Sequence, residues 1–317
     1  MKAVVGSVAL CSVLVFGCAH AKAWQPSAGH VQIPIWPGLP PDQPTFPGTE
    51  TATTRKDDLA TDAPRSWTWI ADANVAKPTM TVYAPKGKST GAAVVVFPGG
   101  GFQVLAMDLE GTEVCHWLTS IGIRCVLLKY RVPSAPYSWQ CNCYPHGAFV
   151  VSVPALEDAQ RTIRLVRFHA AKWHVDPHKV GVIGFSAGGY LVAETSVDFN
   201  RQFYKPVDVA DRESDRPDFA MAIYPGHIET SHGLNPNLHF TPETPPTFIV
   251  QAETTTMDHV RQSLGYYSAL ANAGAPAEMH LYAQGGHAFG VRRTRLPISH
   301  WTSLADTWLR TIGVIGK

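Results

Sequence analysis

The sequence predicts an α/β fold, a single domain whose mostly parallel central sheet is flanked by helices. From residue 92 onward, short apolar runs alternate with helical segments, the pattern of parallel strands joined by crossover helices. Several runs, such as Ala92–Phe97, are apolar throughout, as in strands covered on both faces. No internal repeat and no linker divides the core, and 317 residues with 45% hydrophobic content can bury a large one.

The elements follow in order. Residues 24–60 read as a proline-rich arm, lying on the domain or linking it to a membrane. Trp67–Ile70 and Met80–Tyr83 alternate as short strands and predict an antiparallel edge. The other expected strands share an apolar run: 92–97, 124–129, 179–183, 219–224, 247–251 and 277–282. The expected helices share helical spacing: 113–120, 156–173, 260–273, 300–312 and one that starts near residue 190.

The first 23 residues are expected to be a signal peptide. Lys2 precedes an apolar stretch, Ala3–Gly17, that is too short to span a bilayer comfortably. Small residues near Ala21 and Ala23 suit an ordinary signal peptidase, whereas an imperfect lipobox ending at Cys18 would give a lipid-anchored N-terminus. Both alternatives predict export to the periplasm or beyond. A net charge of +1 argues against nucleic acid or an anionic membrane surface as partner.

Export permits disulfides, and four cysteines remain after the expected signal: Cys115, Cys125, Cys141 and Cys143. Three pairings are possible, although Cys141 and Cys143 are too close in sequence to bond each other without strain. A zinc site with His146 is the alternative for the last two. No second ligand pair at metal spacing follows them, so we expect no metal.

The segment Gly184–Gly189 predicts a nucleophile. It contains Ser186 in a G-x-S-x-G pattern between an apolar strand and a helix. Glycines on both sides allow the serine a strained turn that lifts its hydroxyl above the end of the strand. Alone, the pattern also fits a glycine-rich turn with an idle serine.

Two further segments complete the chemistry of a serine hydrolase. His287 follows the last expected strand within a glycine-rich loop, where a general base is needed. The backbone N–H groups of Gly100, Gly101 and Ala187 are the expected oxyanion hole. A phosphate cradle is the rival interpretation of the glycine run, but no Lys-Ser/Thr pair follows it.

Together these motifs resemble the α/β-hydrolase fold, and in detail the bacterial acetyl-xylan- and feruloyl-esterase-like carbohydrate esterases of the esterase/lipase superfamily. The likeness runs from about Thr79 to Ile312, within a domain expected over 61–317. The resembling segments are Pro98–Phe102, Gly184–Gly189, Pro245–Phe248, Gln262–Leu264 and Gly285–Gly290.

The resemblance implies an exported serine carboxylic-ester hydrolase without cofactor. Its substrates would be short acyl or phenolic esters, those of plant polysaccharide in particular. A serine peptidase of the same fold is an alternative, as is a degenerate binding protein that keeps the pocket and has lost turnover.

One departure from the family concerns the acid that orients the base. The family places an aspartate in the loop after strand 247–251, at the position where this chain has Thr255. A threonine carries no charge to stabilise an imidazolium. Asp258 is the preferred substitute, with Glu253 second and Glu229 a remote third. If none serves, the binding-protein alternative gains weight.

Some nearby residues are expected outside the site. Asp158 precedes Ser186, the wrong order for the acid in this fold, and Glu110 is expected to cap the helix after the glycine loop. The loop with Tyr137, Trp139 and Tyr144 could stack a sugar or phenolic ring, or simply pack onto the domain.

Overall fold

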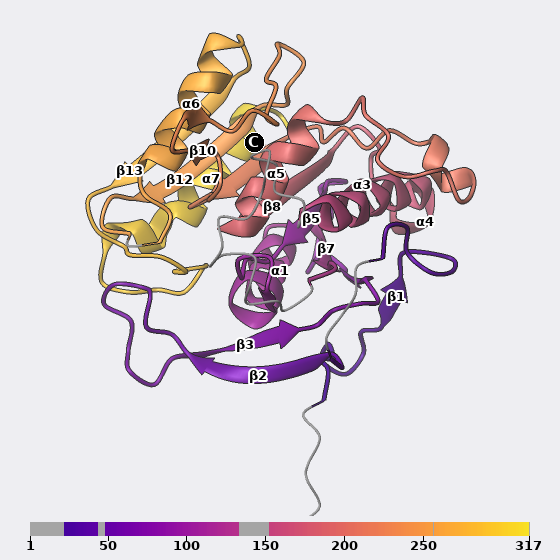
Figure 1. The fold of residues 1–317 in the computed structure, drawn as a ribbon, viewed down its shortest axis with the longest axis horizontal. Coiled ribbons are helices and arrows are strands. Elements are labelled where there is room, and N and C mark those ends of the chain that lie inside the picture. Colours follow the sequence, from indigo (N-terminus) through magenta and orange to yellow (C-terminus); the bar gives the residue numbers. More distant parts are fainter. Residues whose placement is uncertain (1–21, 44–47, 133–151, 256, 317) are drawn as a thin grey trace, which may run out of the picture.

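The computed structural model describes residues 22–43, 48–132, 152–255 and 257–316. Its main sheet has eight strands in the order β1-β4-β7-β5-β8-β9-β12-β13 (Figure 1). Their bounds are β1 Gln32–Pro34, β4 Thr79–Tyr83, β7 Arg124–Lys129, β5 Ala93–Phe97, β8 Val180–Phe185, β9 Ala220–Ile223, β12 Thr247–Ala252 and β13 Ala277–Tyr282. The mostly parallel sheet flanked by helices that the sequence predicts is therefore confirmed.

The edge formed by β1 and β4 is antiparallel, and the strands from β7 to β13 run parallel. The N-terminal arm supplies β1, whose Ile33 pairs with Met80 of β4. Every residue of β5 and of β8 is buried, as continuous apolar runs require. The two central strands thus end in the middle of the sheet's carboxyl edge, where both glycine-rich turns begin.

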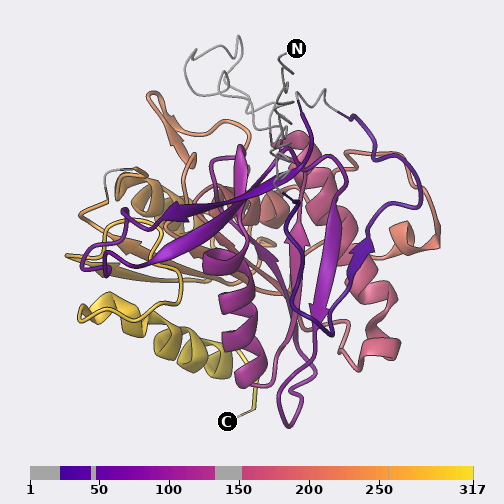
Figure 2. The same ribbon diagram turned by 90° about the horizontal axis from the view of Figure 1, so that it is seen from below.

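Helices cover both faces of the sheet. Figure 2 shows α1 (Glu113–Ser120) and α7 (Trp301–Thr311) side by side on one face, where the rings of Trp117 and Trp301 lie 5.2 Å apart. The other face carries α3 (Val153–Phe168), α5 (Ala187–Val197) and α6 (Arg261–Asn272). The remaining short elements are α4 Ala170–Trp173, the turns η1 Asp108–Thr112, η2 Val209–Arg212 and η3 Pro297–His300, and the hairpin β10 Glu229–Thr230 with β11 Gly233–Leu234.

A second sheet was not expected from the sequence. It contains β2 (Thr51–Lys56), β3 (Thr68–Ala73) and β6 (Val104–Ala106), all antiparallel, and β2 and β3 cross the lower edge of Figure 1. The strand expected at Trp67–Ile70 exists, but it joins this small sheet rather than the main one. The reason is that the loop after the first glycine turn pairs with β3, through Ala71 and Ala106.

The helix expected over 156–173 is two helices, α3 and α4, which meet at His169. Within α3, Asp158 is fully buried and accepts hydrogen bonds from Trp36 Nε1 (2.7 Å) and Arg131 Nε (2.9 Å). These bonds fasten the arm and the end of β7 to α3. Asp158 therefore lies outside the site and binds structural partners, as its position before Ser186 led us to expect.

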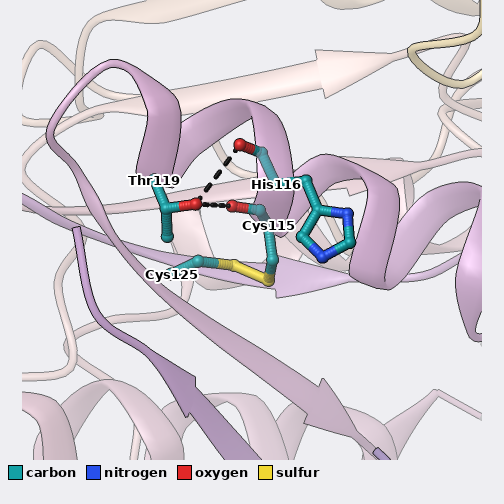
Figure 3. The surroundings of a disulfide bond; sticks show 4 residues. All are labelled: Cys115, His116, Thr119 and Cys125. Carbon is teal, nitrogen blue, oxygen red and sulfur yellow. Dashed lines mark hydrogen bonds between the residues drawn. A yellow bond between two sulfur atoms is a disulfide. The ribbon is translucent and has the colours of Figure 1, made fainter. Parts of the chain in front are cut away.

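A disulfide joins Cys115 of α1 to Cys125 of β7 (Figure 3). Both cysteines are fully buried, and the hydroxyl of Thr119, one turn further along α1, donates to the carbonyl of Cys115 (2.8 Å). This is one of the pairings that the cysteine count left open. The other two cysteines and the zinc alternative with His146 lie outside the described residues, as do residues 1–21 of the expected signal segment and the aromatic loop around Trp139.

The described part of the chain lacks a membrane-spanning helix and a cluster of metal ligands. In that part of the chain no helix has the length and apolar character to cross a bilayer. Within the same residues no three His, Cys, Asp or Glu side chains gather closely enough to hold a metal ion.

Candidate active site

Ser186 stands at a strained turn between β8 and α5. Its backbone has φ 52° and ψ −116°, outside the regions that side chains favour. The turn is possible because its neighbours lack side chains. A Cβ on Gly184 would lie 2.0 Å from the carbonyl oxygen of Gly188, and one on Gly188 would lie 2.1 Å from that of Phe97. The strained turn predicted from the glycine spacing is confirmed.

His287 comes to the same point from the loop after β13. Its Nε2 lies 3.0 Å from Ser186 Oγ, within hydrogen-bonding distance. The end of the N-terminal arm and the first residue of the domain hold this loop, because His287 N donates to Leu59 O and Thr61 N donates to Gly285 O, both at 2.9 Å. The ring packs beside that of Tyr224, 4.8 Å between centroids. Nothing in the sequence of the arm indicated that it positions the histidine.

The other ring nitrogen of His287 faces a hydroxyl rather than a carboxylate. Thr255 Oγ1 lies 3.3 Å from Nδ1. Asp258 is near, but on the other side of the ring, with Oδ2 3.0 Å from Ser186 Oγ and 3.6 Å from Nε2. The expected bond from Asp258 to Nδ1 is therefore not formed. Three residues beyond Thr255, the chain has turned toward α6, and Gln251 Nε2 holds it there by donating to Asp258 O (2.9 Å).

Burial shapes the charge of these groups. It lowers the pKa of His287 to about 4, so the imidazole is neutral near pH 7. Burial also raises the pKa of Asp258 to about 6, against the stabilising hydrogen bond from Ser186 and the charge of His259. Near neutral pH the site therefore holds a neutral base, a hydroxyl and a carboxylate within 3.6 Å of one another.

The first glycine turn lies against Ser186. Gly100 and Gly101 both have positive φ, 131° and 65°, and a Cβ on Gly100 would lie 2.0 Å from the carbonyl oxygen of Val104. Both glycines line the cavity that contains Ser186, and Ala187 begins α5 directly after it. The three expected oxyanion donors thus come from a turn and a helix N-terminus that flank the serine.

Glu110 has a different place from the expected helix cap. Its Oε2 accepts a hydrogen bond from Gly99 N (2.7 Å), and its Oε1 accepts one from the hydroxyl of Tyr224 (2.8 Å). It is 2% exposed and lines the cavity, and burial raises its pKa to about 7. No side chain caps η1 or α1. No sequence pattern indicates this role, because the glutamate and its partners come from three separate segments.

The remaining candidates for the acid lie elsewhere. Glu253 is exposed, directly after β12. Glu229 belongs to the β10–β11 hairpin, where its Oε2 lies 3.9 Å from Arg261 Nε. Neither forms a hydrogen bond or ion pair with His287 in the described part of the chain. Of the three candidates, Asp258 is therefore the one that contacts the Ser186–His287 pair.

The cavity above Ser186 has a volume of about 470 Å³, within the range of small-molecule sites. Its lining combines the catalytic candidates with residues of the small sheet and of nearby loops. The lining residues are Arg55, Leu59, Trp69, Gly100, Gly101, Gln103, Val104, Ala106, Leu109, Glu110, Ser186, His227, Met257, Asp258, His287 and Ala288.

Comparison with known proteins finds relatives that include esterases. A family model described as BD-FAE matches residues 80–224. The crystal structure of an acetyl ester-xyloside bifunctional hydrolase from Caldicellulosiruptor lactoaceticus is 31% identical with a TM-score of 0.67, and the match covers 90% of this chain and 97% of that one. An acetylxylan esterase from Xylanibacter ruminicola is 28% identical over 255 residues, 75% of this chain and 47% of that protein.

A second curated relative, endo-1,4-beta-xylanase B from Butyrivibrio fibrisolvens, is 27% identical over 222 residues, 62% of this chain and 32% of that protein. The chain thus spans less than half the length of either curated relative. The solved relative, by contrast, matches along nearly its entire length. The solved relative is more than 30% identical, and the mostly parallel sheet of this chain is that of the α/β-hydrolase fold. This chain therefore belongs to the esterase family of the α/β-hydrolase fold.

Proposed function

We propose that this protein is an exported serine carboxylic-ester hydrolase that removes short acyl or phenolic groups from plant polysaccharide through an acyl-enzyme. The observation that carries the proposal is the 3.0 Å contact between His287 Nε2 and Ser186 Oγ at a strained turn. The acetylxylan esterase and the acetyl ester-xyloside hydrolase among the relatives support the substrate class. The apolar N-terminus and the buried disulfide support export, since structural disulfides persist in oxidising compartments.

In the proposed reaction, the Ser186 hydroxyl turns its proton from Asp258 Oδ2 to His287 Nε2, which takes it as Oγ attacks the ester carbonyl carbon. The carbonyl oxygen becomes an oxyanion that accepts hydrogen bonds from backbone N–H groups at Gly100, Gly101 and Ala187. Each such donor typically contributes about 10²–10³ in rate. The imidazolium then protonates the leaving alkoxide, and a water attacks the acyl-enzyme with His287 again as base, which releases the acid and restores Ser186.

Asp258 has a role in this scheme that differs from that of a usual triad acid. It cannot orient Nδ1, but its carboxylate lies 3.6 Å from the nitrogen that becomes protonated. At an effective dielectric constant of about 20, unit charges at this distance attract by about 5 kcal/mol. The proposed role of Asp258 is that of a counter-charge for the imidazolium. At Nδ1, by contrast, His287 faces the uncharged hydroxyl of Thr255.

The test is release of acid from 4-nitrophenyl acetate and from acetylated xylan by the purified protein. Ser186→Ala is expected to lower kcat on both by at least about 10³-fold. Wild-type protein should also be labelled by a fluorophosphonate, and the Ser186→Ala variant should not. Hydrolysis that survives in the variant would refute the acyl-enzyme mechanism.

Thr255 supports a second candidate, a binding protein that keeps the cavity and has lost turnover. Without a charge at Nδ1, loss of about 10⁴ in kcat is typical of serine hydrolases. The two candidates separate in one experiment. A protein that reacts with the fluorophosphonate is an enzyme, whereas one that binds xylo-oligosaccharides but neither reacts nor hydrolyses esters is the binding protein.

A further inference from the structure

One face of the small sheet forms a wall of the active-site cavity. Side chains alternate between faces along a strand, so Trp69 and Ala71 of β3 share a face, and Ala106 of β6 pairs with Ala71 on it. Arg55 of β2 pairs with Trp69 and lies on the same face. Both large side chains and Ala106 line the cavity. Small residues thus occupy the centre of this wall, and the Arg55–Trp69 pair occupies its outer end.

Trp69 is held in place at this outer end. Its Nε1 donates to the carbonyl of Lys56 (3.1 Å), and the guanidinium carbon of Arg55 lies 5.4 Å from its ring centroid. A half-buried indole fixed in this way is a preformed surface for a sugar ring, because little side-chain freedom remains to be lost on binding.

Arg55 brings a positive charge to this wall. The described residues offer it no carboxylate within the distance of an ion pair, although Arg292, Arg295 and other arginines have one. Among the described residues that line the cavity, Arg55 is also the one that stays positively charged at every ordinary pH. The two histidines there are neutral, since burial lowers the pKa of His227 to about 3 and that of His287 to about 4.

The volume of the cavity leaves room for more than an acyl group. An acetyl group has only a few non-hydrogen atoms, whereas the cavity measures about 470 Å³. Most of the space must therefore serve the alcohol side of the ester. Two apolar side chains that line the cavity are partly exposed, Leu59 by 37% and Met257 by 58%. A sugar chain leaving Ser186 along this wall would pass the indole and end at the guanidinium.

We propose that Arg55 and Trp69 form a subsite for the alcohol part of the substrate, a glycosyl chain that carries a carboxylate, as a uronic acid branch does. This rests on the proposed function and specifies its substrate class. Trp69 stacks on a sugar ring, and Arg55 binds the carboxylate through charge-assisted hydrogen bonds. Arg55 acts on recognition and not on the bonds that break.

The test compares two substrates of the same length, acetylated xylo-oligosaccharides with and without one glucuronic acid branch. The ratio of their kcat/KM values is the readout, and wild-type protein should favour the acidic substrate. Arg55→Gln is expected to lower this ratio about three- to tenfold through KM, which is the scale of an exposed charge contact. The preference of the wild type should also shrink at high salt.

Lys56→Gln is the matched control. It removes the same charge one residue away, on the opposite face of β2, and should leave the ratio unchanged. Trp69→Ala is expected to weaken both substrates. A ratio that is the same in wild type and Arg55→Gln, or that falls equally in Lys56→Gln, would overturn the subsite.

A binding measurement keeps the subsite separate from the proposed function. The Ser186→Ala variant is titrated calorimetrically with the deacetylated acidic and neutral oligosaccharides. The acidic oligosaccharide should bind more tightly than the neutral one, and this difference should disappear in the Ser186→Ala/Arg55→Gln double variant. That result supports the subsite even if no ester is hydrolysed. Hydrolysis of 4-nitrophenyl acetate with no preference for acidic oligosaccharides in either measurement refutes the subsite and leaves the esterase intact.

Discussion

The substitution Thr255→Asp should accelerate this protein. Thr255 Oγ1 lies 3.3 Å from His287 Nδ1, so an aspartate at this position places a carboxylate where Nδ1–H can donate to it. The carboxylate would fix the tautomer with its proton on Nδ1 and stabilise the imidazolium formed during attack. Thr255 is 4% exposed, and the bond would form in a largely dry environment.

The size of the effect has an upper and a lower bound. Loss of the charge at Nδ1 costs about 10⁴ in kcat in well-studied triads, which sets the largest gain. Asp258 already places a charge 3.6 Å from Nε2, and a second buried carboxylate beside it costs desolvation and repulsion. We therefore expect a gain in kcat of about 10- to 10³-fold, equivalent to about 1.4–4 kcal/mol of barrier.

The assay is kcat and KM on 4-nitrophenyl acetate across pH 4 to 9, with Thr255→Asn as the matched neutral variant. The introduced carboxylate also raises the pKa of His287 above about 4. In an Asp258→Asn background, which lacks the limb from Asp258, the acid limb of kcat should therefore move upward with Thr255→Asp and not with Thr255→Asn. Equal rates for the two variants would refute the reasoning, because they would show that the base is not limited by a missing charge at Nδ1.

Three other predictions concern groups around the same site. In wild-type protein kcat/KM should fall as the pH drops through about 6, because Asp258 becomes protonated there while His287 stays neutral. The pH profile of the Asp258→Asn variant should lack this fall in kcat/KM. The substitution Glu110→Gln turns an amide donor toward Gly99 N–H or the Tyr224 hydroxyl. As a result kcat should fall about 10- to 10²-fold with KM almost unchanged. An unaltered kcat would show that Glu110 does not position the glycine turn. Reduction of the buried disulfide should lower the free energy of unfolding by about 3 kcal/mol, measured by denaturant titration with and without reductant.

The sequence predicted the parallel part of the fold well because its signals are local. A continuous apolar run such as Val94–Val96 marks a strand buried on both faces, and helix α1 has the predicted bounds because its spacing is regular. The small sheet was not predicted, since β6 has only three residues and its pairing with β3 depends on where the glycine turn sends the chain. The alternation at Trp67–Ile70 predicted strand β3, but not the strands with which it pairs.

In the site, too, features set by local sequence were predicted and features set by the path of a loop were not. The glycines around Ser186 encode a backbone conformation, and the predicted turn is there. The relation of His287 to a carboxylate depends instead on the path of a loop, and three residues of displacement carry Asp258 to the opposite side of the imidazole. Spacing identified the carboxylate nearest to the pair but not the nitrogen that it faces.

The hydrogen bonds of Glu110 connect the two loops on which the proposed reaction depends. Its carboxylate holds Gly99 at the start of the oxyanion turn, and Tyr224 passes the connection on, since its hydroxyl accepts from Gly290 N (3.1 Å) in the histidine loop. Two turns from opposite ends of the sequence are thereby fixed relative to each other through one buried acid. A fully buried glutamate is costly unless its oxygens are bonded, and both are bonded here. That cost is understandable if the distance between oxyanion donors and base must be kept within fractions of an ångström, as catalysis by preorganised dipoles requires.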